Sequence, residues 1–394
     1  APAPAPAPAP APSRGELDVG ELDSLFSARG PPPRRTAEGI PAAEERSTNV
    51  SASSSSGGGS TSTMHTVLPL RRANAVAGAL AQLKVGGAAV RVALAEASDE
   101  ALTLEALRAL PAALPTEEDA KAVRSAYGSA PSTEEIAKMP EADAFLVEIL
   151  KVPRAAIKAE VLLYRREFDS LVETAIQRSG CVVTAATEVQ HSEQLARILE
   201  IILALGSILT RGGSKGAASG GYKLASLTKL TETKAANKST TLLHYLAKTV
   251  ESKSRELLRF ASELPTLAEA ASVPVAALEV EGQALRRGLR LALEEQRRCG
   301  GEGSAFADAV NRFAPRAEVQ LQRLEAKLRE LAPALEGLAG YFEEPSEKAQ
   351  DIFRILHSFA ASFATAAEDN KRAREKKRAE KARAAAAAAA EGEE

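Results

Sequence analysis

Several kinds of residue are rare in this sequence of 394 residues. Tryptophan is absent, aromatic residues make up only 4% of the chain, and cysteine occurs only at Cys181 and Cys299. Two cysteines cannot build a disulfide framework or a cysteine-rich zinc site, so we expect free thiols in a reducing compartment. The most apolar stretch, 198–209, contains Glu200 and is shorter than the roughly 20 residues that a membrane-spanning helix requires. The sequence therefore predicts neither a disulfide-rich secreted domain nor an integral membrane span.

Excess charge and catalytic motifs are also missing. The 50 basic residues nearly balance the 52 acidic ones, for a formal net charge of -2, whereas nucleic-acid-binding domains are usually strongly basic. The four histidines are His65, His191, His244 and His357. None of them belongs to a recognised metal-binding motif, and the glycine-rich stretch 211–221 lacks the Gly-Lys-Ser/Thr ending of a phosphate-binding loop. We therefore expect no nucleic-acid partner, no enzyme activity, no metal and no cofactor.

The N-terminal part of the chain has a biased composition. Residues 1–12 are six Ala-Pro repeats, which favour an extended polyproline-like segment. Such a segment either binds a proline-reading protein or serves as a stiff spacer, and the repeats alone do not decide between the two. Residues 15–28 can form a short helix. The stretch 30–66 is rich in Pro, Ser, Gly and Thr, so we expect a flexible linker there.

From Leu68 onward, the sequence predicts helix after helix. Ala, Leu, Glu, Lys and Arg dominate, which favours helices, and strand signals of comparable strength are missing. Thr116 followed by three acidic residues is typical of a helix start, with Thr116 as the N-cap. Further helices are expected over 155–177, 192–209, 222–230 and 239–264. The predicted fold class is therefore all-α.

A heptad-like seam of apolar residues runs between Phe306 and Leu338. Its members are Phe306, Val310, Phe313, Ala317, Leu321, Leu324, Leu328, Leu331, Leu335 and Leu338. Spacings of three and four residues place these side chains on one face of a helix, against a partner helix, as in a coiled coil. Because Pro315 and Pro333 interrupt the pattern, we expect long helices with kinks or breaks near these prolines.

The C-terminal part of the chain is basic. Eight Lys and Arg residues fall between 371 and 383, against two acidic residues, and alanines fill 384–390. This run is either a solvated helix end or an electrostatic patch for an acidic partner. The sequence alone leaves both interpretations open.

Three stretches of the sequence resemble one known family. Residues 199–246 read LEIILALGSILTRGGSKGAASGGYKLASLTKLTETKAANKSTTLLHYL, with Lys-Leu, Thr-Lys and Leu-Leu-His motifs after a glycine-rich loop. Residues 104–127 contain a leucine-rich helix followed by Pro-Thr-Glu-Glu and a Tyr, and 341–370 is an aromatic-rich segment ending in Glu-Asp-Asn. Together they closely resemble the formin homology-2 domain, over roughly residues 15–385. The resemblance implies an elongated all-α fold with a knob, a coiled-coil-like bundle and a post.

This resemblance also implies a division of the chain into five parts. They are a proline-rich remnant of the formin homology-1 region at 1–14, a truncated lasso at 15–29, a flexible linker at 30–66, the formin homology-2 core at 67–370 and a basic, Ala-rich tail at 371–394. In the family, the lasso of one subunit wraps the post of another, which closes a head-to-tail dimer into a ring.

The function implied by the resemblance involves no covalent chemistry. Formins nucleate actin filaments and stay associated with their fast-growing barbed ends. We therefore expect actin as a partner, profilin as a partner of the proline-rich N-terminus unless the repeats are only a spacer, and a location in the cytoplasm, at the cytoskeleton. The alternative is a divergent, weakly active or inactive scaffold that binds filament sides or microtubules through its basic tail.

The family's actin contacts can be carried over to individual residues. The lysine after Thr in the signature is Lys234, and Lys229 and Lys223 lie on the same motif. The family also presses an Ile of the first knob helix into an apolar cleft of actin, and this position falls at Ala77 or Gly78. Neither is a large apolar residue, which favours the scaffold alternative, whereas the intact Lys234 favours actin binding.

The dimer contacts depart from the family pattern. The family lasso inserts Trp side chains into the post, and this chain has no Trp. The remaining candidate lasso anchors are Leu22, Leu25 and Phe26. The expected post residues are Tyr341, Phe342, Phe353, Phe359 and Phe363. We therefore expect a weakened homodimer: a monomer or a loosely associating pair.

Overall fold

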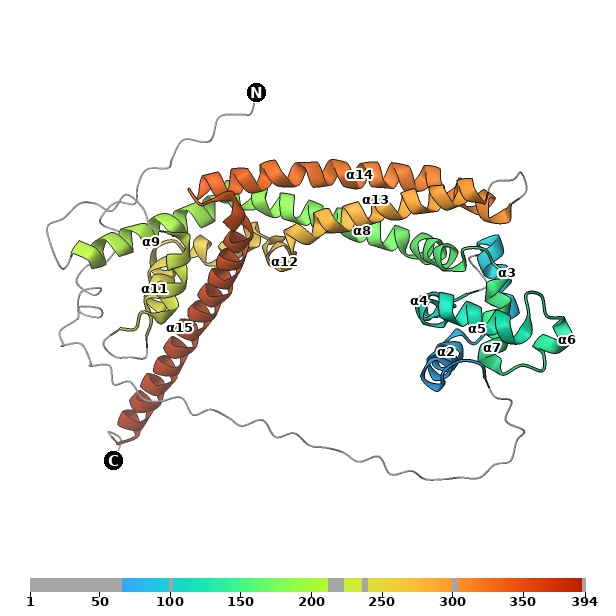
Figure 1. The fold of residues 1–394 in the computed structure, drawn as a ribbon. Helices are drawn as coiled ribbons and strands as arrows, with labels where there is room; N and C mark the ends of the chain where they lie inside the picture. The colour runs from blue at the N-terminus through green and yellow to red at the C-terminus, as the bar shows by residue number, and fades with distance from the viewer. Residues whose placement is uncertain (1–65, 99–101, 212–222, 236–239, 300–303, 392–394) are drawn as a thin grey trace, which may run out of the picture. The chain divides into compact units, whose positions relative to one another are not determined.

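Helices form nearly all of the regular structure in the computed structural model of this chain (Figure 1). The structure describes residues 66–98, 102–211, 223–235, 240–299 and 304–391. Within these ranges, the one extended pairing is an isolated antiparallel bridge between Lys234 and Thr241. The prediction of an all-α fold is therefore confirmed, while the predicted proline-rich segment, lasso and nearly all of the linker lie outside the described residues.

The chain forms two compact units, each with its own apolar core. Within the described residues, unit 1 lies in 174–280 and 324–391, and unit 2 lies in 66–173 and 281–323. The divisions fall inside three long helices, α8 (Ala155–His191), α13 (Val275–Arg298) and α14 (Ala305–Tyr341). Each of these helices therefore contributes residues to both units.

Unit 2 contains a cluster of short helices. They are α2 (Leu70–Leu83), α3 (Gly87–Glu96), α4 (Leu104–Ala113), α5 (Glu117–Tyr127), α6 (Thr133–Ile136) and α7 (Glu141–Leu150). Helix α2 packs on α4 and α7, and both α3 and α5 contact α7. At the start of α5, the Asp119 amide donates to the Thr116 hydroxyl, and the Thr116 amide donates to the Asp119 carboxylate. This capping box confirms the helix start predicted at Thr116.

A buried carboxylate ties the first described residues to this cluster. Asp143 is fully buried and accepts hydrogen bonds from the Thr66 hydroxyl at 2.6 Å and the Val67 amide at 3.1 Å. The Tyr127 hydroxyl donates to the same carboxylate at 2.8 Å. Burial, together with the neighbouring Asp143, raises the pKa of Tyr127 to about 12. Three donors thus satisfy a carboxylate that would otherwise be costly to bury.

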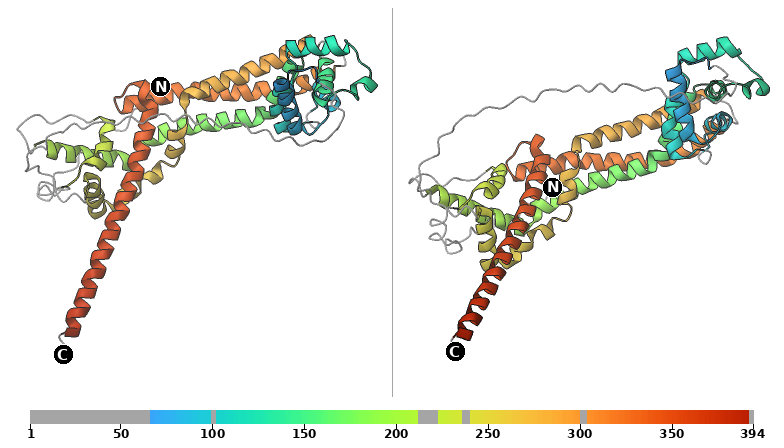
Figure 2. Two further views of the ribbon diagram at one scale, coloured as in Figure 1. Left: turned by 60° about the horizontal axis from the view of Figure 1, so that its bottom comes forward. Right: turned by 90° about the horizontal axis from the view of Figure 1, so that it is seen from below.

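The unit 2 parts of α8, α13 and α14 lie side by side (Figures 1 and 2). The Tyr164 hydroxyl of α8 donates to the Leu285 carbonyl of α13 at 2.8 Å. The Tyr164 ring also meets Phe168 and Phe313 edge to face, with ring centroids 5.4 and 5.8 Å away. Gly288 makes room for this ring, because a Cβ atom at that position would lie 2.5 Å from it. Aromatic packing therefore joins the three helices here.

The predicted heptad seam is the buried face of α14. All of its members are buried except Leu328 and Leu335, which are half-buried. The breaks expected near Pro315 and Pro333 do not occur, since α14 is helical without interruption from Ala305 to Tyr341. Both prolines lie at exposed positions off the seam, where a backbone carbonyl that loses its helical partner can bond to water instead.

Unit 1 is built around the last helix. Its elements are α9 (Glu193–Arg211), η2 (Leu224–Thr228), α10 (Lys229–Glu232), α11 (Leu242–Lys253), η3 (Arg255–Glu263), α12 (Leu267–Ser272), η4 (Ser346–Lys348) and α15 (Ala349–Glu391). Helices α11 and α12 pack on α15 (Figure 2). Phe260 of η3 meets Phe359 and Phe363 of α15 with ring centroids 5.8 and 5.5 Å apart. These rings belong to the core of the unit.

Both cysteines are free thiols, as expected. Burial and nearby carboxylates raise the pKa of Cys181 to about 11, and burial also raises the pKa of Cys299. Both thiols are therefore protonated at neutral pH, which is the opposite of what a reactive cysteine requires.

No single helix among the described residues combines the length and the apolar composition needed to cross a bilayer. Helices α2 and α3 meet that criterion only as a pair, and they are bent by 72° at the break between them. Their buried side chains, Val76 and Val90 among them, belong to the core of unit 2.

Candidate functional site

The three lysines of the predicted binding motif lie on one short segment of unit 1. Lys223 precedes η2, Lys229 begins α10, and Lys234 follows α10. All three side chains are exposed. The leucines between the first and last of them are buried: Leu224, Leu227 and Leu230. The apolar side chains therefore anchor this lysine segment (residues 223–234) and leave its ammonium groups in solvent.

The backbone at Lys234 is held by hydrogen bonds on both sides. The Ala235 amide donates to the Thr240 carbonyl at 2.8 Å. The Leu242 amide donates to the Thr233 carbonyl, also at 2.8 Å. Because the backbone is fixed, an exposed Lys234 would lose mainly side-chain freedom on binding a partner, and such preorganisation favours binding.

His244 links the lysine segment to α15. At the start of α11, the Thr241 hydroxyl lies 2.7 Å from Nδ1 of His244. The other ring nitrogen, Nε2, lies 3.7 Å from the Asp369 carboxylate, and the Asn370 side-chain amide donates to the His244 carbonyl at 2.8 Å. His244 is therefore a positioning residue. The sequence places His244 in the Leu-Leu-His motif but does not predict its contact with Asp369, which lies far away along the chain.

Several apolar residues of the 199–246 signature form the core on which the lysine segment packs. Leu242, Leu243 and Leu246 of α11 are buried in the core of unit 1, together with Leu205 of α9. The Leu-Leu-His motif thus combines two core side chains with the histidine that positions the helix start.

The second predicted contact lies on α2 in unit 2. Ala77 and Gly78 are both exposed. A Cβ atom added at Gly78 would have no neighbouring heavy atom within 4 Å, so this position has room for a larger side chain. The exposed large apolar side chain of this helix is Leu70, at its first turn.

The five aromatic residues predicted at the post fall into two groups. Tyr341 is 47% exposed and Phe342 is half-buried, and their rings meet edge to face with centroids 4.9 Å apart. Phe353, Phe359 and Phe363 are buried in the core of unit 1. Of the five, only the first pair is therefore open to a partner, and the dimerisation role of all five stays a prediction. The predicted lasso residues lie outside the described residues: Leu22, Leu25 and Phe26.

The basic tail continues α15 as a helix. Residues 371–385 are all exposed. Arg374 forms an ion pair with Glu251 of α11, and Lys371 and Arg372 each lie within ion-pair distance of Glu368. Within the described part of the chain, the other basic residues of the tail have no ion-pair partner: Lys376, Lys377, Arg378, Lys381 and Arg383. The tail thus carries charges that are solvated and accessible.

The predicted lysines are exposed, and their role in binding stays a prediction. Among the described residues, no three His, Cys, Asp or Glu side chains come together as metal ligands. The buried Glu295 accepts a hydrogen bond from Arg154 at 2.7 Å and so has a structural partner. The class of protein is therefore an all-α domain that presents lysines on a fixed segment.

Comparisons with known proteins identify the family within this class. The family model described as Formin Homology 2 Domain matches residues 9–364, so the chain belongs to the formin homology 2 domain family. Formin-like protein 14 of Arabidopsis thaliana is 30% identical over 365 residues, which cover 91% of this chain and 28% of that protein. Formin-like protein 6 of Oryza sativa subsp. japonica is 29% identical over 359 residues, which cover 90% of this chain and 25% of that protein. The chain thus spans about a quarter of the length of these relatives.

Proposed function

We propose that this chain is an actin-assembly domain that nucleates filaments and associates with their barbed ends. The observation that carries the proposal is the exposed Lys234 on a fixed backbone, within a chain of the formin homology 2 family. Its ammonium group offers a point charge to an acidic surface of actin, and Lys229 and Lys223 extend the same positive surface. Binding of this kind requires no catalytic group.

In this proposal the parts of the domain have different tasks. The short helices α2–α7 form the knob, the long helices α8, α13 and α14 form the bundle, and the core of unit 1 forms the post. The boundaries are those of the resemblance: a proline-rich remnant at 1–14, a lasso at 15–29, a linker at 30–66, the core at 67–370 and the tail at 371–394. The protein acts in the cytoplasm, at the cytoskeleton.

The proposed working form is a head-to-tail dimer that is weakened in this chain. A large aromatic side chain buried at an interface is typically a hot spot of about 2 kcal/mol or more. The proposed lasso has no Trp, and Leu22, Leu25 and Phe26 bury less area. Tyr341 and Phe342 support the other side of this contact, because they are the accessible post aromatics.

The N-terminal repeats have two candidate roles. As a ligand for profilin, the Ala-Pro repeats would bring actin monomers close to the domain. As a stiff spacer, they would only set a distance. Binding of labelled profilin to the full chain, compared with a chain that lacks 1–14, distinguishes the two roles.

A second candidate function is binding to the side of a filament or a microtubule through the basic tail. The observation that favours it is the exposure of all eight basic residues of the tail, five of which have no ion-pair partner among the described residues. Such binding is mainly electrostatic, so it needs neither the lysine segment nor α2.

Assembly of pyrene-labelled actin in the presence of the purified full chain tests the proposal. We expect a shorter lag and an altered rate of barbed-end elongation from filament seeds. A folded, helical chain that changes neither quantity contradicts the proposal. Co-sedimentation with filaments in the absence of any effect on assembly would instead favour the second candidate.

A further inference from the structure

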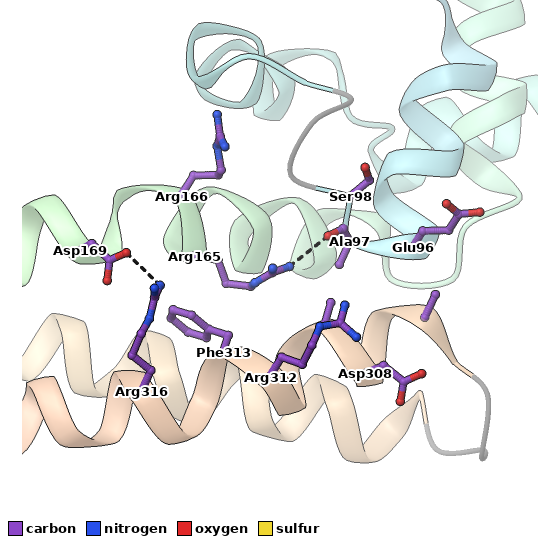
Figure 3. Close-up of a pocket in the computed structure, with 12 residues that line it drawn as sticks. Glu96, Ala97, Ser98, Arg165, Arg166, Asp169, Asp308, Arg312, Phe313 and Arg316 are labelled. Atoms are coloured by element: carbon purple, nitrogen blue, oxygen red, sulfur yellow. Dashed lines mark hydrogen bonds and ion pairs between the residues drawn. The ribbon is translucent and has the colours of Figure 1, made fainter.

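Two pockets of unit 2 differ in the chemistry of their linings. The larger, of about 810 Å³, is lined by residues of α3, α8 and α14, most of which are charged (Figure 3). In Figure 3, Arg166 extends from the side of α8 that faces away from Arg312, so these two cations do not converge on one ligand. The smaller, of about 440 Å³, has mainly uncharged lining residues, which are Ala126, Tyr127, Pro131, Met139 and Pro140. We call it the Tyr127 pocket.

Local hydrogen bonds hold the walls of the Tyr127 pocket. Helix α5 ends at Tyr127, and the chain leaves it at Gly128, whose φ of 77° favours glycine. At the start of α6, the Ser132 amide donates to the Glu135 carboxylate at 2.7 Å, and the Glu135 amide donates to the Ser132 hydroxyl at 3.3 Å. The Tyr127 hydroxyl is bonded to Asp143, which fixes the ring. The pocket is therefore preformed, so a ligand loses little free energy in ordering it.

The lining has the chemistry that binds a proline-rich strand. Peptides of this kind dock their proline rings against aromatic and apolar side chains, and their backbone carbonyls have no internal hydrogen-bond partner. The Tyr127 ring, together with Pro131 and Pro140, provides the apolar surface. Lys138 is an exposed lining residue whose ammonium group can donate to a peptide carbonyl. An uncharged Ala-Pro strand also loses no charge solvation when it enters.

The first described residue of the chain lies beside this pocket. The Thr66 hydroxyl donates to one oxygen of the Asp143 carboxylate at 2.6 Å, and the Tyr127 hydroxyl donates to the other oxygen at 2.8 Å. Residues 13–65 connect Thr66 to the six Ala-Pro repeats at 1–12. At roughly 3.3 Å for each extended residue, this connection is long enough to return the repeats to the pocket.

We propose that the Tyr127 pocket binds the Ala-Pro repeats of its own chain. The repeats are identical, so any of the six can occupy the site. Because the connection turns binding into an intramolecular event, a contact that is weak between separate molecules becomes populated within one chain. Docked repeats are withheld from a proline-reading protein, which must compete with the pocket for them. This inference holds whether or not the domain assembles actin.

Competition between the tethered repeats and a free peptide tests the proposal. The probe is a labelled peptide of six Ala-Pro repeats, titrated by fluorescence anisotropy against the full chain and against a full-length serine variant. That variant replaces six prolines by serine: Pro2, Pro4, Pro6, Pro8, Pro10 and Pro12. We expect the parent chain to bind the probe at least about twofold more weakly, because a tethered competitor whose effective concentration equals its dissociation constant already occupies half of the sites. Equal binding by the two chains, or binding by neither, would overturn the proposal.

A substitution in the lining, added to the serine variant, places the probe in this pocket. Ala126→Lys fills the space with a long charged side chain at the C-terminal turn of α5, where a cation suits the helix dipole. It should weaken probe binding at least about tenfold, with unchanged helicity. The control is Ser125→Lys, which adds the same charge at an exposed position outside the lining and should leave binding unchanged. Equal binding by these two lysine variants would overturn the proposal.

Hydrogen–deuterium exchange separates the repeats of the same chain from those of a second copy. We expect peptides that cover 124–142 to exchange more slowly in the parent chain than in the serine variant, to the same extent at low and high protein concentration. Slowing that grows with protein concentration would assign the repeats to a second copy and overturn the proposal. Displacement of the labelled probe by an Ala-Ser peptide of equal length would overturn the requirement for proline.

Discussion

The lysine segment of unit 1 and the exposed face of α2 in unit 2 differ in what they offer a partner. The lysine segment keeps three exposed cations on buried leucine anchors. The α2 face offers only Ala77 and Gly78 where the family resemblance implies a large apolar side chain. Charged groups contribute mainly to association rate and orientation, whereas buried apolar anchors contribute most to affinity. If the proposed function holds, this domain therefore retains its charged contact with actin and has weakened its apolar one.

The largest effect concerns self-association, since the proposed lasso lacks aromatic anchors other than Phe26. We expect the chain to be largely monomeric, or a rapidly exchanging dimer, at micromolar concentration, because hot-spot aromatic side chains are missing from the interface. Light scattering coupled to size-exclusion chromatography measures this. A tight dimer that persists at nanomolar concentration would show that another surface provides the apolar anchor. It would contradict the claim that the apolar contacts of this domain are weakened.

The second-largest effect, on actin binding, is expected from a variant that introduces a large apolar side chain on α2. Gly78→Ile places a large side chain in open space, and its burial against a partner is worth roughly 1.5–3 kcal/mol. We therefore expect actin binding to strengthen by about tenfold or more. Fluorescence titration of labelled actin measures the change.

The control for this variant is Gly78→Ala, which gives the same helix a better helix former without the apolar bulk. It should fold at least as well as the parent chain and should leave actin binding nearly unchanged. If both substitutions strengthen binding equally, helix stability is the cause, and α2 makes no apolar contact with actin.

A smaller effect is expected from His244, which positions the start of α11. His244→Ala removes the contacts with Thr241 and Asp369, and loss of a helix-capping interaction typically costs about 0.5–2 kcal/mol. We expect a lower melting temperature and a several-fold loss of actin assembly, because the lysine segment ends next to this helix start. His191→Ala, at an exposed position of α8, is the control. An unchanged melting temperature would show that His244 does not stabilise the start of α11.

The smallest effect concerns the basic tail. Deletion of 371–394 removes eight basic residues, so filament binding should weaken at low salt and change little at high salt, where screening is strong. Co-sedimentation at two salt concentrations measures the difference. Equal binding of the two chains at low salt would leave the tail as a solvated helix end. Loss of all binding at both salt concentrations would favour the second candidate function.

The sequence predicted those features of the fold that depend on local pattern. The ten-residue seam of α14 is its buried face, and Thr116 caps α5, because periodicity and capping need only neighbouring residues. Pro315 and Pro333 were expected to disturb the helix, yet α14 is unbroken, since both lie on its solvent side. Helix α8 likewise continues past the expected end at 177, through Ser179 and Gly180, because side chains such as Val182 are buried beyond them.

The candidate site was less predictable, because it depends on residues far apart in the sequence. The contact between His244 and Asp369 joins α11 to α15 and leaves no trace in local spacing. Phe359 and Phe363, which the family resemblance assigns to the dimer contact, are buried in the core of unit 1, and an apolar pattern alone does not predict which aromatic residues are exposed. The motif identified Lys234 as a candidate contact, whereas the hydrogen bonds that fix its backbone could not be predicted from the motif.

The most direct test of the account is the rate of actin assembly by Lys234→Ala, measured with pyrene-labelled actin beside Lys121→Ala. Lys121 is an exposed lysine of α5 outside the signature, so it controls for the loss of one charge. A charge-assisted contact contributes roughly 1.5–3 kcal/mol, so the account predicts that Lys234→Ala assembles actin at least about tenfold less well, with unchanged helicity, while Lys121→Ala matches the parent chain. Assembly by Lys234→Ala at the rate of the parent chain would contradict it.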